Sequence, residues 1–125
     1  MPTYFLDTYA LIEITKQNPL CKKFSSIKES LTGGLNLMEL YYISTREFGN
    51  DIGERDYKLF TPIKTSHSEE TMKRAMQLRV KLRKEKKLKL SYADAIGYQI
   101  ALENNLQFVT GDGAFKELEN VEFIG

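Results

Sequence analysis

The chain has 125 residues, 42% of them hydrophobic, which is enough for one compact core and too little for two, so we expect a single domain over residues 1–125. Eighteen Lys and Arg against seventeen Asp and Glu leave a net charge of +1, which indicates neither a strongly cationic nor a strongly acidic protein. A single cysteine, Cys21, and a single histidine, His67, exclude a disulfide scaffold and a zinc module built from these residues.

The N-terminal residues 1–14 have no basic leader, and Asp7 and Glu13 interrupt their apolar stretch. This stretch is far shorter than the roughly 18 apolar residues that a membrane span needs. We therefore expect a soluble, cytoplasmic protein without a membrane segment.

The first part of the chain predicts a strand followed by helical segments. Residues 3–6 are β-prone and end at Asp7, and residues 8–14 have helical spacing. Residues 20–29 indicate a second, polar-faced helix. The glycine-containing residues 30–35 have room for a strand.

The central part of the chain predicts two helices. Residues 36–48 form a strong helical pattern that ends at Gly49, with Asn36 and Glu39 in the spacing of a capping box. Residues 51–60 predict a further helix.

The next part predicts two more helices and a strand. Residues 67–87 form a long helical pattern crowded with lysine at its far end. Residues 91–104 predict a helix in which Ser91 and Asp94 repeat the capping signature. Residues 107–110 read as a strand.

The last segments complete an alternation of strands and helices. A turn leads to a short helix over residues 115–118, and residues 121–124 predict the final strand. This alternation predicts an α/β fold with a parallel sheet.

Four acidic residues lie at predicted helix starts: Asp7, Glu39, Asp94 and Asp112. In a parallel α/β sheet the helix starts share one edge, so these carboxylates are candidates for one pocket. Their repulsion would favour a hard divalent cation, and an all-oxygen site selects Mg²⁺ or Mn²⁺ and suits phosphodiester hydrolysis. The alternative is that each acid only caps its own helix, and for any single acid capping is the simpler explanation.

Four short segments follow one another along nearly the whole chain: YFLDTYAL at residues 4–11, NLMEL at 36–40, SYADAI at 91–96 and VTGDGAF at 109–115. In this order and spacing they resemble the PIN-domain ribonuclease family. The resemblance implies a three-layer α/β/α PIN-like domain with a central parallel sheet. It also implies a Mg²⁺- or Mn²⁺-dependent endoribonuclease that acts on RNA.

The resemblance also assigns roles to residues. Asp7, Glu39, Asp94 and Asp112 fall on the acidic, catalytic positions of the family. Asp7, Asp94 and Asp112 would be metal ligands, Glu39 a further ligand or a holder of metal-bound water, and Thr110 a supporting hydroxyl.

Small chains of this kind resemble the VapC-type toxins of type II toxin-antitoxin systems. That resemblance implies a homodimer and a partner antitoxin protein. Two alternatives remain open: a PIN-type nuclease of RNA maturation, and a non-catalytic module of the same fold that binds RNA or protein.

Positive charge is concentrated in residues 73–89, which hold nine basic residues and one acid, whereas the rest of the chain holds nine basic and sixteen acidic residues. Lys84, Lys86 and Lys87 are candidates for contacts with RNA phosphates. The alternative is a solubilising helix end whose lysines favour the helix dipole. Tyrosines that could stack on bases have the helical spacing of core or dimer contacts: Tyr41, Tyr42, Tyr92 and Tyr98.

Overall fold

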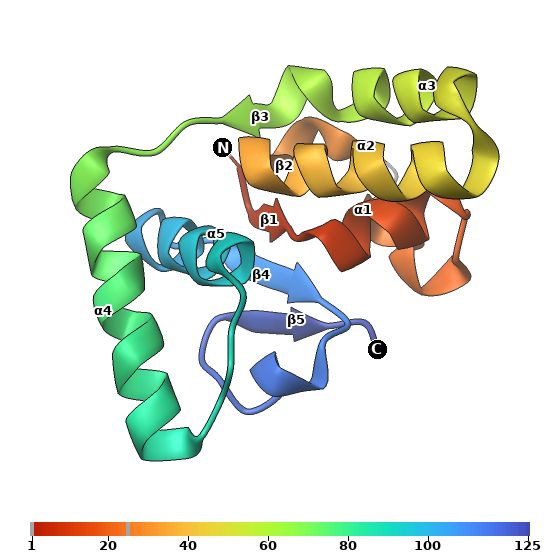
Figure 1. Cartoon of the computed structure of the whole chain (residues 1–125). Coiled ribbons are helices and arrows are strands. Elements are labelled where there is room, and N and C mark those ends of the chain that lie inside the picture. The colour runs from red at the N-terminus through yellow and green to blue at the C-terminus, as the bar shows by residue number, and fades with distance from the viewer. Residues whose placement is uncertain (1, 25) are drawn as a thin grey trace.

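The computed structural model describes residues 2–24 and 26–125 (Figure 1). Within these residues the strands form one five-stranded parallel sheet in the order β3-β2-β1-β4-β5. The predicted parallel sheet is therefore confirmed. The strands are β1 (Tyr4–Leu6), β2 (Ser30–Gly33), β3 (Lys64–Thr65), β4 (Gln107–Thr110) and β5 (Val121–Phe123).

Helices cover both faces of this sheet. The α-helices are α1 (Thr8–Thr15), α2 (Gly34–Phe48), α3 (Asn50–Phe60), α4 (Glu69–Lys86) and α5 (Tyr92–Glu103). Short 3-10 helices connect them: η1 (Pro19–Phe24), η2 (Ile27–Glu29), η3 (Thr61–Ile63) and η4 (Gly113–Phe115). In the described part of the chain, no helix combines the length and apolarity that a membrane crossing requires.

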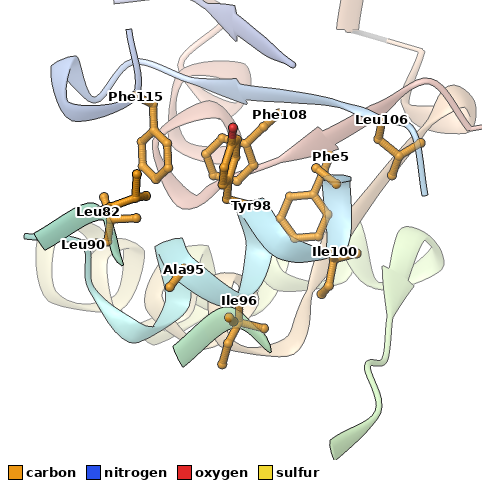
Figure 2. Packing of buried hydrophobic residues seen from close by; sticks show 12 residues of the cluster. Phe5, Leu82, Leu90, Ala95, Ile96, Tyr98, Ile100, Leu106, Phe108 and Phe115 are labelled. Atoms are coloured by element: carbon orange, nitrogen blue, oxygen red, sulfur yellow. The ribbon is translucent and has the colours of Figure 1, made fainter. Parts of the chain in front are cut away.

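The alternation of side chains along the two central strands creates two cores. Phe5 and Phe108 point toward α4 and α5, and their rings stack with centroids 5.9 Å apart (Figure 2). Leu6 and Val109 point to the opposite face and pack among residues of α1 and α2. Because one buried cluster lies on each side of the sheet, the expected three-layer α/β/α architecture is confirmed.

A glycine brings α5 unusually close to the sheet. A Cβ atom added at Gly97 would lie 2.8 Å from the ring of Phe5, so no side chain fits there without movement. Gly97 is one turn after Asp94 on the same helix. The close approach therefore places the start of α5, and Asp94 with it, beside the carboxyl end of β1.

The predicted helix over residues 20–29 is wrong, because this stretch forms the 3-10 helices η1 and η2; Ser25 lies outside the described residues. The buried residues of η1 are Cys21 and Phe24. They are three residues apart, a spacing that a 3-10 helix places on one face. The segment is thus anchored to the core by two side chains.

The predicted capping box at Asn36 and Glu39 is also wrong. Helix α2 begins two residues earlier, at Gly34. Its N-cap residue is Gly33, which has no side chain to cap the helix. Asn36 is buried and donates from Nδ2 to the hydroxyl of Thr8 at 3.2 Å instead. Glu39 consequently lies beyond the first turn of its helix.

Two smaller differences concern the sheet edges. The two-residue strand β3 has no counterpart in the sequence prediction, because a strand this short carries no periodic pattern. The short helix expected at residues 115–118 lies earlier, at Gly113–Phe115, because Asp112 caps it through a hydrogen bond from the amide of Ala114.

Candidate active site at the carboxyl edge of the sheet

The site lies where the order of the strands reverses. From β1 the chain builds β2 and β3 on one side, and it then returns to place β4 and β5 on the other. The segments that leave β1 and β4 therefore separate at their carboxyl ends, which is the position of ligand sites in open α/β sheets. Strands β1 and β4 lie side by side (Figure 1). Leu6 is paired with Val109, so Asp7 and Thr110 follow at neighbouring positions.

Asp7 is the buried one of the four acids, with only 2% of its surface exposed. It is the N-cap of α1, and its Oδ1 accepts a hydrogen bond from the amide of Ala10 at 2.8 Å. Burial raises the pKa of Asp7 to about 7, and repulsion from Asp94 and Asp112 adds to this rise. Hydrogen bonds from Thr110 and Ala10 lower the pKa but do not compensate for burial.

Thr110 connects Asp7 to the loop after β4. Its side chain is fully buried, it hydrogen-bonds to the Asp7 carboxylate, and its Oγ1 accepts from the amide of Asp112 at 3.0 Å. The loop also contacts α1, because a Cβ atom at Gly111 would lie 2.1 Å from the ring of Tyr9. Only glycine permits this approach, and Tyr9 therefore borders the site.

Asp94 enters the site from α5. The hydroxyl of Ser91 caps this helix by accepting from the Asp94 amide at 3.0 Å. Burial raises the pKa of the Asp94 carboxyl, and the charges of Asp112 and Glu39 raise it further, whereas hydrogen bonding to Ser91 lowers it. The carboxylate of Asp94 therefore lies near enough to Asp112 and to Glu39 to be repelled by each of them.

Glu39 is held at the site by residues that the sequence analysis did not select. The hydroxyl of Thr8 donates to Oε1 of Glu39 at 2.5 Å, and Asn36 donates to that hydroxyl at 3.2 Å. This chain of hydrogen bonds joins α1 to α2. The position of Thr8 immediately after Asp7 at the strand-to-helix corner was the available signal.

The donor set agrees with a hard cation, although the structure contains no ready-made three-residue coordination shell. Among the described residues, no three His, Cys, Asp or Glu side chains are close enough together to hold one ion. Mg²⁺ commonly binds proteins through one or two carboxylates and retains several waters, and the all-oxygen site fits that mode. Each helix cap observed at Asp7 and Asp112 uses one carboxylate oxygen, Oδ1. Capping and cation binding are therefore compatible.

The basic residues of α4 are arranged differently from these acids. Lys84, Lys86 and Lys87 are exposed at the C-terminal end of the helix, where Lys87 adopts a left-handed conformation (φ 57°). In residues 2–24 and 26–125, no ion pair involves these three lysines. Their charges remain available for a polyanion.

The model of the PIN domain family matches residues 4–121. No curated protein matches the sequence. Several solved structures share the fold across almost the full chain, at sequence identities at which the likeness is one of fold alone.

Three of these structures are similar to the chain at TM-scores above 0.7. The DNA-bound VapBC complex from Salmonella typhimurium has a TM-score of 0.78 and 17% identity, with 99% of this chain and 98% of that chain covered. A toxin-antitoxin complex from Klebsiella pneumoniae has a TM-score of 0.73 and 17% sequence identity, with 96% of both chains covered. The sarcin-ricin loop cleaving toxin VapC20 from Mycobacterium tuberculosis has a TM-score of 0.73 and 14% sequence identity, with 98% of this chain and 97% of that chain covered.

Proposed function

The chain belongs to the PIN domain family, and we propose that it is a Mg²⁺- or Mn²⁺-dependent endoribonuclease that hydrolyses RNA phosphodiester bonds. One observation carries the proposal. Carboxylates from separate elements repel one another around the buried Asp7. Burial raises the pKa of Asp7 to about 7. Such a site is unfavourable for an isolated domain and favourable for one that binds a cation.

In this proposal the acidic residues have different roles. Asp7, Asp94 and Asp112 would hold the cation, directly or through its bound waters, and Glu39, oriented by Thr8, would be a further ligand or would hold water. A divalent cation, when bound, supplies Lewis-acid chemistry for phosphodiester hydrolysis. Thr110 would be the supporting hydroxyl, because its hydrogen bonds connect Asp7 to the backbone of Asp112.

We further propose that the protein is the toxin of a type II toxin-antitoxin pair. The fold neighbours described as a toxin-antitoxin complex, a DNA-bound VapBC complex and a sarcin-ricin loop cleaving toxin support this assignment. The proposal includes an antitoxin protein as partner, a homodimer as the active species, and a cytoplasmic location. In the RNA complex, Lys84, Lys86 and Lys87 would contact phosphates without reading bases.

The direct experiment is a cleavage assay on single-stranded RNA with and without divalent cation. We expect cleavage in Mg²⁺ or Mn²⁺, none in excess EDTA, and recovery when the cation is restored. Undiminished cleavage in excess chelator would remove the cation from the mechanism. No cleavage under any of these conditions would contradict the nuclease assignment itself.

A further inference from the structure

A groove lies between the second half of α4 and the segment that leads to α5. Its volume is about 180 Å³. Val80, Leu88 and Leu90 contribute its apolar part, and four cationic side chains surround them: Arg79, Arg83, Lys84 and Lys89. Closed sites for small molecules commonly measure about 300–1,000 Å³. This groove therefore suits one ring of a longer ligand better than a whole cofactor.

Arg79, which lines this groove, forms an ordered pair with Tyr92, which lies outside the lining. Nε of Arg79 donates to the carbonyl oxygen of Leu90 at 2.7 Å, which fixes the guanidinium. The guanidinium carbon lies 4.8 Å from the ring centroid of Tyr92. Tyr92 as a whole residue nevertheless remains 64% exposed. An aromatic surface that is held in place and still open to solvent can accept a planar ligand with little further loss of conformational entropy.

Tyr92 and the acidic residue Asp94 belong to the same helix. Tyr92 is the first residue of α5, and Asp94 is in the same helical turn. Two residues correspond to about 3 Å along a helix axis. Around the axis the same two residues are about 200° apart, so RNA that stacks on Tyr92 would have to pass around the start of α5 to reach the carboxylates.

We propose that this basic groove, together with the Tyr92 ring that Arg79 holds beside it, is a nucleobase subsite for single-stranded RNA. A base stacks on the ring of Tyr92, and Arg83, Lys84 and Lys89 contact the adjoining phosphates. Sites for single strands combine a basic groove with an aromatic surface in this way. An acidic protein segment would need the positive charges but not the open aromatic ring, so the ring favours RNA. The inference rests on the proposed function and adds the position of the substrate.

The chain contains a matched control for this pair. Tyr42 on α2 is 62% exposed, and the guanidinium of Arg46 lies 5.3 Å from its ring centroid. Arg46, however, also forms an ion pair with Glu47 at 3.1 Å. The two tyrosines thus have similar exposure and a similar cation neighbour, and they differ in the charge around them.

The test uses tryptophan as a reporter, because the chain contains none. Tyr92→Trp and Tyr42→Trp proteins are titrated in EDTA with a single-stranded RNA oligonucleotide, so that binding is measured without cleavage. We expect saturable quenching of the Tyr92→Trp emission and no change for Tyr42→Trp. Tyr92→Ala should weaken RNA binding about ten-fold, and Tyr92→Phe should bind like wild type, because stacking requires the aromatic ring and not the hydroxyl. Unchanged melting temperatures confirm that the variants fold.

Two further probes identify the occupant. Equal quenching by an oligomer of abasic sugar-phosphate units would mean that the groove binds phosphate alone, which overturns the base subsite. A response to polyglutamate without a response to RNA would assign the groove to an acidic protein segment and also overturns it.

A cleavage assay of the wild-type protein separates this inference from the proposed function. Mg²⁺-dependent cleavage together with unaltered RNA binding by Tyr92→Ala would overturn the subsite and leave the nuclease assignment standing. Quenching of Tyr92→Trp by RNA without any cleavage by the wild-type protein would overturn the nuclease assignment and support the groove as an RNA site.

Discussion

The carboxylate site and the C-terminal half of α4 are both rich in charge, but they are built in opposite ways. The carboxylates come from segments far apart in the sequence, and hydrogen bonds to helix starts and hydroxyl groups hold them. The lysines of α4 come from one continuous run and are exposed to solvent. Folding brings the acids together against their repulsion, whereas it leaves the lysines hydrated.

This difference indicates which region limits stability and which is free to bind a partner. A buried carboxylate loses hydration and is opposed by its neighbours, so its charged form destabilises the fold until a cation compensates. Exposed lysines lose little hydration, so their charges do not lower the stability of the fold and are available to bind a polyanion.

The largest effect is expected for Asp7→Asn. Asparagine has nearly the same size and can still cap α1, but it removes the charge at the centre of the site. We expect RNA cleavage to fall at least about 1,000-fold, since a bound cation contributes several kcal/mol to such reactions. Initial rates at saturating Mg²⁺ measure the loss. Wild-type rates would show that Asp7 is only a helix cap.

The metal-free protein should lose stability as the pH rises from about 4 to about 7. The pKa of folded Asp7 is raised from 3.8 to about 7, so the folded state keeps a proton that the unfolded state has released in this range. The contribution of Asp7 to the free energy of unfolding is therefore largest below pH 4. It falls by at most about 4 kcal/mol as the pH rises past 7. Asp94, whose pKa is also raised, acts in the same direction.

Urea unfolding in EDTA at several pH values measures this dependence. Asp7→Asn is the control, because it lacks the titrating group and retains the remaining carboxylates. The difference in free energy of unfolding between the two proteins should grow with pH in favour of the variant. Parallel profiles would place the buried charge elsewhere.

Charge reversal of Lys84, Lys86 and Lys87 should weaken RNA binding and flatten its salt dependence. Each phosphate contact on a single strand contributes about 0.7 to the slope of log affinity against log salt, so the slope should fall by about 2 and the affinity at 0.1 M salt by roughly two orders of magnitude. Binding isotherms at several salt concentrations in EDTA measure both quantities. Reversal of the exposed lysines Lys22, Lys28 and Lys58 is the matched control. Equal slopes in the two triple variants would make the α4 lysines a solubilising surface.

The smallest effect separates ligation from capping at Asp94. Mg²⁺ at ten times its dissociation constant should stabilise the wild-type protein by about 1.4 kcal/mol and Asp94→Asn much less. Without metal the variant should be no less stable than wild type, because a repulsion has been removed. Thermal melts of both proteins with and without Mg²⁺ measure these shifts. Equal Mg²⁺-induced shifts together with retained cleavage would leave Asp94 as a helix cap.

The sequence by itself determined the order of most elements and the chemistry available at the site. Alternation of short apolar runs with amphipathic helices indicated the parallel α/β fold, because such local periodicities need no partner to be recognised. The caps at Asp7 and Ser91 were likewise visible, since capping depends on neighbours within three residues. The four acids could be named for the same reason, although their joint role remained a prediction.

Only the tertiary structure decided how these pieces meet. Pairing of β1 with β4 puts Asp7 beside Thr110, although 103 positions separate them in the sequence. The early start of α2 directs Asn36 to Thr8 and leaves Glu39 in the second turn, which no local pattern encodes. Burial by the surrounding core raises the pKa of Asp7. The pairing of Arg79 with Tyr92 likewise depends on where the loop after α4 passes. These features depend on long-range packing, and a sequence pattern reports only local preference.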